Sequence, residues 1–503
     1  MHSFYILFKY QFIFFFLFSI LNLSAGKKVK VRILSTTDVH HYIENGDTEG
    51  AGGLLRVATL IKNHRKSLGG DKVLLLDSGD TIQGSVSAVA TKGEAIVDLF
   101  NHLKYDAWAL GNHELDFGIP QLYKLMNKTE VPVLAGNFRL KAPYEKKFKS
   151  WKIYTKNNAR ICVIGMQASY LSHWFKGRLF EEYEVDKAYD HILREMPRIL
   201  KEKPDMIILA IHHGFLFKDS RGVNEVKEIA RRFPQIDLIL GGHTHQPYPG
   251  RNVSGVYYAQ AAYHCSHLGV IDAVIDIDAH EVVKMESFLE EASSAIAKDP
   301  EAAKVYEKWR NRVNEFSSKA IVELNEEISS RGTPGKSCAV SSMIAQSIKK
   351  ESGADFAVHG RFSTKSLSGK VTEKDLHGVI PYENFIYVLT LSEEQLLKLM
   401  EEQVKFLSSR SFNGPEGFEV ILDKTKTKIE ELKLPYKKER YTLAVNSRVA
   451  AGGGGRYLWL REQIQSGKIP FREIEVNTRE AVRKFLESSK GVFEFKGFLK
   501  EQK

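Results

Sequence analysis

Apolar runs of strand length alternate with helix-length stretches through residues 28–300, and this alternation limits the fold of the chain more than any other feature. Helices are expected at 54–64 and 93–103, and strand-like apolar runs at 29–34, 73–76, 107–110, 131–135, 161–166, 206–210 and 238–240. Short continuous apolar runs are typical of strands that are buried on both faces. The pattern therefore predicts an α/β layered fold.

Length and composition favour a packed protein of several domains. At 503 residues the chain is too long for one core. Its content of 43% hydrophobic and 27% charged residues is ordinary for a folded protein. The net charge of +10 is spread along the sequence, so no nucleic acid polymer is predicted as a partner. The 3 cysteines form neither a disulfide framework nor a Cys-x-x-Cys zinc spacing.

Residues 1–25 have the pattern of a signal peptide. A weakly basic start precedes a run rich in phenylalanine and isoleucine, and the segment ends on the small residues Ser24 and Ala25. The alternative is an uncleaved anchor, although the run is short for a bilayer span. No later apolar segment of the sequence has spanning length. We therefore expect a periplasmic or secreted protein with no stable membrane span after cleavage.

Polar residues of metal-binding type follow five of the expected strands. They are Asp38 and His40 after the first, Asp80 after the second, Asn112 with His113 after the third, His212 after a fourth, and His243 with His245 after a fifth. Open α/β folds place their sites at the carboxyl ends of the strands. Glycines such as Gly79 and Gly242 beside these residues would allow sharp turns. We therefore expect the polar residues to meet at one edge of the sheet.

The chemistry of this set predicts a pair of divalent ions. Carboxylate, carboxamide and imidazole without thiolate suit Zn²⁺, Mn²⁺, Co²⁺ or Fe²⁺. Seven or more ligands are too many for one tetrahedral ion, whereas two ions that share a carboxylate would each have about four. Paired ions about 3.5–4 Å apart activate a water and stabilise charge on phosphoryl oxygens. The implied reaction is the hydrolysis of a phosphate ester.

The motifs that carry these residues resemble those of the calcineurin-like metallophosphoesterases, and among them the 5′-nucleotidases. The matching segments are DVH (38–40), GDTIQGS (79–85), GNHELDFG (111–118), HHG (212–214) and GGHTH (241–245). The resemblance implies a four-layer catalytic domain of β-sheets flanked by helices. It also implies one ion held by Asp38, His40, Asp80 and His245, and another held by Asp80, Asn112, His212 and His243.

The same resemblance assigns the remaining site histidines. His113 and Asp116 resemble the catalytic pair of the family, in which the carboxylate orients the imidazole and raises its proton affinity. His41 and His213 adjoin predicted ligands, and the pattern of histidine, any residue and glycine selects His212. Both are therefore expected near the ions without binding them. His264 and His267 have no assigned role and are expected to be structural.

The rest of the chain is expected to form a linker helix and a smaller α+β domain. Residues 26–286 would be the catalytic domain, 287–319 a solvated amphipathic helix, and 320–503 a domain that resembles the substrate-binding domain of 5′-nucleotidases. The resemblance places Tyr382 where an aromatic ring stacks on the base. It places Lys336 and Arg361 where cations contact phosphate. Rotation of one domain against the other is also implied.

Two segments of the second domain depart from the family pattern. VHGRFSTK (358–365) replaces a segment rich in glycine, and Arg448 and Gly454 stand where the family carries an aromatic ring and an aspartate. Arg448 could stack on a base, because guanidinium planes do so, or it could meet a second anionic group.

The sequence thus predicts an exported two-metal phosphoesterase that acts on a small phosphate ester, with nucleoside 5′-monophosphates as the leading substrates. The alternatives are cyclic nucleotides, nucleotide sugars, a sulfur-linked substrate like that of the related thiosulfohydrolase, and a non-catalytic binding protein on the same scaffold. The intact ligand set and the His113–Asp116 pair argue against the binding protein.

Overall fold

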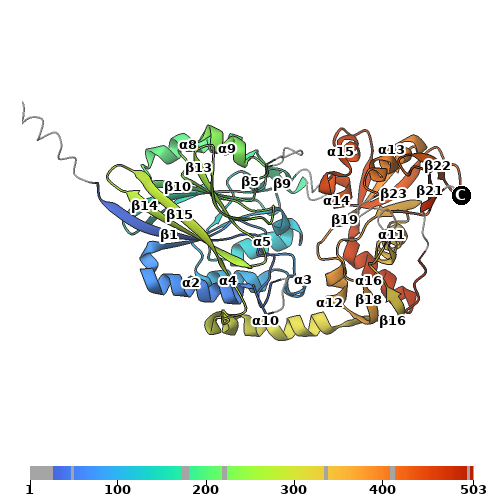
Figure 1. Cartoon of the computed structure of the whole chain (residues 1–503), viewed down its shortest axis with the longest axis horizontal. Coiled ribbons are helices and arrows are strands. Elements are labelled where there is room, and N and C mark those ends of the chain that lie inside the picture. The colour runs from blue at the N-terminus through green and yellow to red at the C-terminus, as the bar shows by residue number, and fades with distance from the viewer. Residues whose placement is uncertain are drawn as a thin grey trace, which may run out of the picture.

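Two lobes joined by one long helix make up the molecule, as the computed structural model shows (Figure 1). The structure describes residues 26–46, 50–171, 181–217, 224–332, 338–407, 414–495 and 499–501. The segment expected to be a signal peptide, residues 1–25, lies outside the described residues. Within the described part of the chain, none of the helices has the length and apolar character that crossing a membrane requires.

Two six-stranded sheets form the centre of the first lobe. The first sheet has the order β15-β14-β1-β2-β3-β4, with β1 to β4 parallel. Its strands are β1 (Lys28–Thr36), β2 (Val73–Asp77), β3 (Ala107–Ala109), β4 (Val133–Leu134), β14 (His267–Asp276) and β15 (Glu281–Glu291). The second sheet has the order β12-β13-β11-β10-β8-β7, and β8, β10, β11 and β13 are parallel. Its strands are β7 (Trp151–Lys156), β8 (Ala159–Met166), β10 (Met206–Ile211), β11 (Leu238–Leu240), β12 (Pro247–Val253) and β13 (Val256–Ala261).

Helices cover the outer faces of the two sheets, so the lobe has four layers and three apolar interiors. The side chains between the sheets include Ile33, Leu74, Ile161 and Ile208. The first sheet packs against α2 (Leu54–Leu68), α4 (Glu94–Leu103) and α5 (Ile119–Lys128), and the second against α8 (Ala188–Lys201) and α9 (Val226–Arg232). A short α3 (Val86–Thr91) and a small sheet of β5 (Phe138–Leu140), β6 (Lys146–Lys147) and β9 (Tyr183–Val185) complete the lobe. This confirms the predicted layered α/β fold.

The linker helix differs from its prediction in extent. Residues 287–291, expected to be helical, form the end of β15, which pairs with β14. The helix is α10 (Pro300–Ser318), and Asp299 caps it by accepting a hydrogen bond from the Ala302 N–H. It is not solvated all round, because Tyr306 is buried and the Trp309 ring N–H donates to Asp98 on α4 at 2.9 Å. The helix thus lies against the first lobe and leads into the second (Figure 1).

A mixed five-stranded sheet with the order β20-β17-β23-β19-β24 forms the centre of the second lobe. Its strands are β17 (Phe356–His359), β19 (Phe385–Leu391), β20 (Gly414–Glu416), β23 (Tyr441–Asn446) and β24 (Phe471–Asn477). The helices are α11 (Ala339–Ser352), α12 (Glu373–Val379), α13 (Glu393–Val404), α14 (Ser447–Ala450), α15 (Leu458–Gln465) and α16 (Thr478–Ser489). β16 (Ala320–Ile328) pairs with β18 (Leu367–Thr372), and β21 (Glu419–Leu422) pairs with β22 (Ile429–Lys433) and β25 (Leu499–Glu501).

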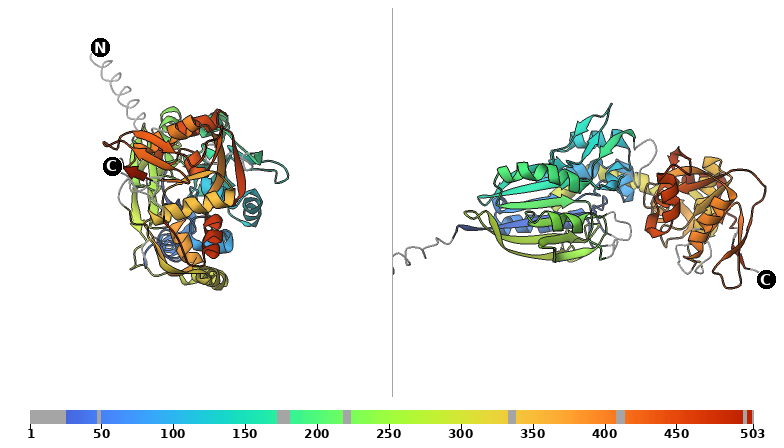
Figure 2. Two further views of the ribbon diagram at one scale, coloured as in Figure 1. Left: turned by 90° about the vertical axis from the view of Figure 1, so that its right-hand side faces the viewer. Right: turned by 90° about the horizontal axis from the view of Figure 1, so that it is seen from above.

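The two lobes touch beside the carboxyl ends of the first-lobe strands. Phe385, the first residue of β19, packs against the apolar cores of both lobes. Figure 2 shows the molecule from two further directions, and Figure 1 shows α10 running from the first lobe to the second. The second lobe therefore meets the first at the edge where the predicted ligands lie.

Candidate metal centre

The predicted ligands gather in one place, although they come from two sheets rather than from the single sheet that we expected. Asp38 and His40 follow β1, Asp80 follows β2, and Asn112 with His113 begins the turn after β3. His212 follows β10, and His243 with His245 follows β11 in the second sheet. The two sheets pack face to face, so their carboxyl ends open onto a common site.

Several of the ligands have a left-handed backbone conformation, which sets the direction of their side chains. The φ angles are 49° for Asp38, 49° for His40, 57° for Asp80, 72° for His243 and 55° for His245. Non-glycine residues rarely adopt this region, and such strain persists only where the surroundings enforce it. Here Asp38 donates its N–H to the Gly79 carbonyl at 2.9 Å, and His40 donates to the Asp80 carbonyl at 2.8 Å. The loops after β1 and β2 thus hold each other in the strained form.

Glycine is required at two positions where the loops of the site approach one another closely. Gly79 has a φ of 94°, and a Cβ there would lie 2.5 Å from the backbone nitrogen of Gly111. A Cβ on Gly242 would lie 2.8 Å from Nδ1 of His212. Both positions therefore exclude larger residues for steric reasons.

One group of ligand atoms combines Asp80, His212 and His243, and Tyr170, whose ring centroid lies 4.7 Å from that of His243, donates a hydrogen bond to Oδ1 of Asn112. His212 donates its Nδ1–H to the Ser78 carbonyl at 2.8 Å, which leaves Nε2 as the lone-pair nitrogen. This Nε2 atom lies 2.8 Å from Oδ2 of Asp80 and makes no hydrogen bond with the residues that the structure describes. Two buried atoms this close without hydrogen-bond geometry suit a common cation.

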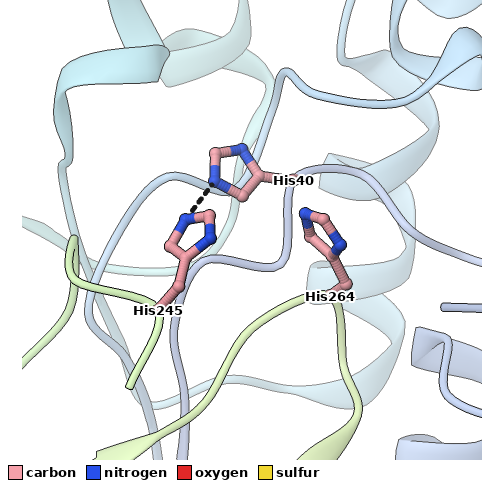
Figure 3. Close-up of side chains that lie close together, drawn as sticks. All are labelled: His40, His245 and His264. Atoms are coloured by element: carbon pink, nitrogen blue, oxygen red, sulfur yellow. Dashed lines mark hydrogen bonds between the residues drawn. The ribbon is translucent and has the colours of Figure 1, made fainter. Parts of the chain in front are cut away.

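A second group combines Asp38, His40 and Asp80, with His245 beside it. His40 donates Nδ1–H to the Gln83 carbonyl at 2.7 Å, so its Nε2 also carries a lone pair. Figure 3 shows this Nε2 atom facing Nε2 of His245, 3.1 Å away. Asp38 Oδ1 lies 3.3 Å from the same atom of His245. Asp80 therefore belongs to both groups, as a carboxylate shared by two ions would.

The electrostatics of the ligands also fit bound cations. Burial alone would raise the pKa of Asp38, but His212 and His245 lower it. Burial lowers the pKa of His40 well below its usual value and that of His243 to about 3, so both imidazoles are neutral. Burial also lowers the pKa of His212, but the charges of Asp80 and Asp38 outweigh it and raise the pKa to about 10, so an ion bound there would have to displace the Nε2 proton.

His113 and Asp116 form a hydrogen-bonded pair at the rim of the site. His113 Nδ1 donates to Asp116 Oδ2 at 2.7 Å, and the His113 side chain is 23% exposed. Burial lowers the pKa of His113, but the charges of Asp116 and Asp80 outweigh it and raise the pKa to about 9. The His113 ring centroid is 5.2 Å from that of His40. A cationic imidazole thus stands beside the ligand groups.

Glu114 is a site residue that our sequence reasoning missed. Its buried carboxylate accepts the backbone N–H groups of Asp80 at 3.0 Å, Thr81 at 2.6 Å and Gly111 at 2.6 Å. It therefore joins the loop after β2 to the loop after β3. The sequence carried one signal for this role, because Glu114 directly follows Asn112 and His113. A carboxylate buried at such a site must accept several hydrogen bonds.

The other histidines divide into two kinds. His41 lies 2.9 Å from Ser87 Oγ and 3.1 Å from Thr91 Oγ1, and the ring nitrogens of His213 face the backbone N–H groups of Ser169 and Glu225. Neither belongs to a ligand group among the described residues. His264, expected to be structural, lies beside His40 and His245.

The predicted substrate residues of the second lobe lie in two places. The Tyr382 ring stacks against His113, with centroids 5.4 Å apart and an interplanar angle of 24°. Arg361 and Arg448 line a cavity of about 260 Å³ together with Arg456, which sequence reasoning missed. The Nε2 atom of His359 accepts a hydrogen bond from the Asn446 amide in the same wall. Lys336 lies outside the described residues.

Comparisons with known proteins agree with this architecture. The family model of calcineurin-like phosphoesterases matches residues 31–247, and the model of the 5′-nucleotidase C-terminal domain matches residues 317–462. Protein 5NUC of Lutzomyia longipalpis is 26% identical over 406 residues, which cover 72% of this chain and 68% of that protein. A 5′-nucleotidase of Vibrio cholerae is 25% identical over 74% of this chain and 75% of its own length.

The fold is also shared with solved structures. A candidate 5′-nucleotidase of Staphylococcus aureus superposes with a TM-score of 0.79 at 19% identity, over 94% of this chain and all of the other. Other relatives are much longer, and the chain spans only 18% of the trifunctional nucleotide phosphoesterase YfkN of Bacillus subtilis, at 30% identity. The chain therefore combines a region that matches the calcineurin-like phosphoesterases with a region that matches the 5′-nucleotidase C-terminal domain, and it resembles the phosphoric ester hydrolases that carry both.

Proposed function

We propose that this protein is a two-metal phosphoesterase whose substrates are nucleoside 5′-monophosphates. The observation that carries the proposal is the sharing of Asp80 by two ligand groups, beside the His113–Asp116 pair. One ion would be held by Asp38, His40, Asp80 and His245, and the other by Asp80, Asn112, His212 and His243. Paired ions of the Zn²⁺, Mn²⁺, Co²⁺ or Fe²⁺ type lower the pKa of a bound water and neutralise phosphoryl charge.

His113 would act on the phosphoryl group from the rim. Asp116 engages its Nδ1–H, which fixes the ring orientation and leaves Nε2 for the substrate. A cationic imidazole there can donate a hydrogen bond to a phosphoryl oxygen or a proton to the leaving oxygen. The resulting charge stabilisation is strongest in the transition state, which is the condition for a gain in turnover.

Two of the predicted substrate residues stand at the same end of the central sheet of the second lobe. Ile386 of β19 pairs with Asn446 of β23, so the segment before β19 and the segment after β23 lie at the same end of the sheet. Tyr382 precedes β19 and reaches His113, while Arg448 follows β23 and lines the cavity. This arrangement supports a substrate with its phosphate at the ions and its nucleoside against the second lobe.

A nucleotide sugar is a second candidate substrate. The side chains of Arg361, Arg448 and Arg456 all line the one cavity. Guanidinium groups pair with phosphate oxygens, so three of them favour a ligand that carries another anionic group beyond the one at the ions.

A panel of esters tests the proposal. We expect the metal-loaded protein to hydrolyse adenosine monophosphate and p-nitrophenyl phosphate, and to lose both activities when a chelator removes the ions. Bis-p-nitrophenyl phosphate, cyclic nucleotides, a nucleotide sugar and a thiosulfate ester test the alternatives. Hydrolysis of none of these compounds by protein shown to contain two ions would contradict a catalytic role.

We also propose export and a division into a catalytic domain, a linker and a second domain, in which the catalytic domain extends beyond residue 286 to include the end of β15. The regions matched by the two family models support the division, with α10 between them. Amino-terminal sequencing of protein recovered outside the cytoplasm should find a start near Gly26. An intact Met1 in that protein would instead favour the uncleaved anchor.

A further inference from the structure

His264 lies against the ligand group that contains His40 and His245. It occupies the loop between β13 and β14 and is 8% exposed. Its ring centroid is 5.4 Å from that of His40 and 5.8 Å from that of His245. One ring nitrogen from each of the three histidines can be chosen so that all lie within 4.8 Å of one another. Figure 3 shows the three rings converging from three separate segments.

The surroundings of His264 hold its ring in this position. The φ angles of Ala262, His264 and Cys265 are 62°, 52° and 53°, so three non-glycine residues of one loop adopt the left-handed region. The His264 N–H donates to the Asp38 carbonyl at 2.8 Å, which joins this loop directly to a predicted ligand. The ring stacks on Tyr42 with centroids 3.8 Å apart and an angle of 17°. Strain of this kind concentrates at functional sites.

We propose that His264 is an additional ligand of the ion held by Asp38, His40, Asp80 and His245. This inference rests on the proposed two-ion site and assigns a role to a side chain outside it. Nitrogen ligands of one Zn²⁺ ion lie about 3.3 Å apart, given bonds of about 2.0–2.1 Å. The pair formed by His40 and His245 already has this spacing at 3.1 Å, and a ring nitrogen of His264 lies within 4.8 Å of a nitrogen of each.

A third imidazole makes the two ion sites chemically unequal. The site with His264 would have three nitrogen donors, whereas the site of Asp80, Asn112, His212 and His243 would have two. Imidazole favours Zn²⁺ and Fe²⁺, whereas oxygen ligands favour Mn²⁺. The His264 site should therefore select Zn²⁺ over Mn²⁺ more strongly than its neighbour does.

Metal binding to the ion-free protein tests this role without reference to activity. The variant His264→Phe keeps a ring that can stack on Tyr42 and removes both nitrogens. His267→Gln is the matched control, since His267 lies three residues away and belongs to no ligand group of the described residues. Calorimetry with Zn²⁺ and with Mn²⁺, elemental analysis, and the absorption spectrum of the Co²⁺ form would be recorded for the wild type and both variants.

We expect His264→Phe to weaken Zn²⁺ binding at one of two sites by about tenfold or more, to change the Co²⁺ spectrum and to reduce the preference for Zn²⁺ over Mn²⁺. His267→Gln should match the wild type. Unchanged Zn²⁺ affinity and an unchanged Co²⁺ spectrum in His264→Phe would overturn the inference.

A second variant keeps the inference testable if His264→Phe misfolds. His264→Asp replaces nitrogen with oxygen and should shift the preference towards Mn²⁺, so an unchanged ratio of the two affinities would also overturn the inference. If the wild type binds two ions and hydrolyses phosphate esters while both variants bind metal as it does, only the role of His264 fails. If the wild type binds fewer than two ions, the proposed centre fails with it.

Discussion

Nδ1 of His113 donates a hydrogen bond to Oδ2 of Asp116 over 2.7 Å, and this contact links a rim imidazole to a buried carboxylate. Neither residue belongs to the ligand groups of the described residues. Mutations of this pair should therefore change proton donation without removing a ligand of either ion.

His113→Gln should lower kcat by about 10²–10⁴-fold, because it removes the group that donates a proton or stabilises charge in the transition state. Metal content should stay at the wild-type level. Single-turnover kinetics and elemental analysis provide the two measurements. Asp116→Asn should give a smaller loss of kcat, and an unaltered kcat in His113→Gln would remove this residue from the mechanism.

Glu114→Gln should reduce the free energy of unfolding by about 1–3 kcal/mol, because an amide N–H₂ would then face backbone N–H groups. The wild-type carboxylate accepts three such groups, from Asp80, Thr81 and Gly111. Metal affinity should also fall, since the loop that carries Asp80 loses its support. Chemical denaturation of the ion-free protein and metal titration check both effects, with the exposed Glu202→Gln as the control. Equal stability of Glu114→Gln and Glu202→Gln would refute the supporting role of Glu114.

Arg448→Tyr should improve the turnover of adenosine monophosphate if the arginine replaces a ring that would stack on the base. Base stacking on an aromatic side chain contributes about 1–3 kcal/mol, so KM should fall several-fold or more. The exposed Arg440→Tyr is the control. Loss of activity towards a nucleotide sugar, with no change in KM for the monophosphate, would instead assign Arg448 to a second anionic group.

Asp355 predicts a pH-dependent contribution to stability far from the metal centre. Burial opposes ionisation, but bonds from Lys438, the Thr442 N–H and Tyr436 lower the pKa of Asp355 to about 2. Because the folded pKa lies below the unfolded value, the stabilisation is present above about pH 4 and is lost as the pH falls towards 2. Asp355→Asn should therefore cost about 1–2 kcal/mol at pH 7, with solvent screening included.

Thermal melting at pH 7 and at pH 3 measures this effect. The difference in melting temperature between the wild type and Asp355→Asn should shrink at the lower pH. If the difference in melting temperature is the same at pH 7 and pH 3, the shape of the Asp355 side chain rather than its charge accounts for the loss of stability.

The ligands that follow β1, β2, β3, β10 and β11 could be predicted because strand length and buried character are local properties. The layered fold explains why these ligands converge. The division of the strands between two sheets could not be predicted, because the apolar runs do not indicate which strands pair. The linker helix was placed too early, since residues 287–291 pair with β14 through contacts distant in sequence. A start at Pro300 was readable from Asp299, which has the residue type of an N-cap.

His264 could not be predicted, because no glycine or motif marks it. Its position depends on the left-handed turn after β13 and on the bond from its N–H to Asp38, which lies more than 200 residues earlier. The arginine cavity escaped prediction for a similar reason. Arg361 and Arg456 are distant in sequence and meet only in the folded second lobe.

Anomalous diffraction from crystals grown with Mn²⁺ tests the central claim most directly. The proposed function predicts two peaks about 3.5–4 Å apart, with the Asp80 carboxylate between them and His212 and His245 on opposite ions. A single peak, or two peaks of which neither touches Asp80, would contradict it.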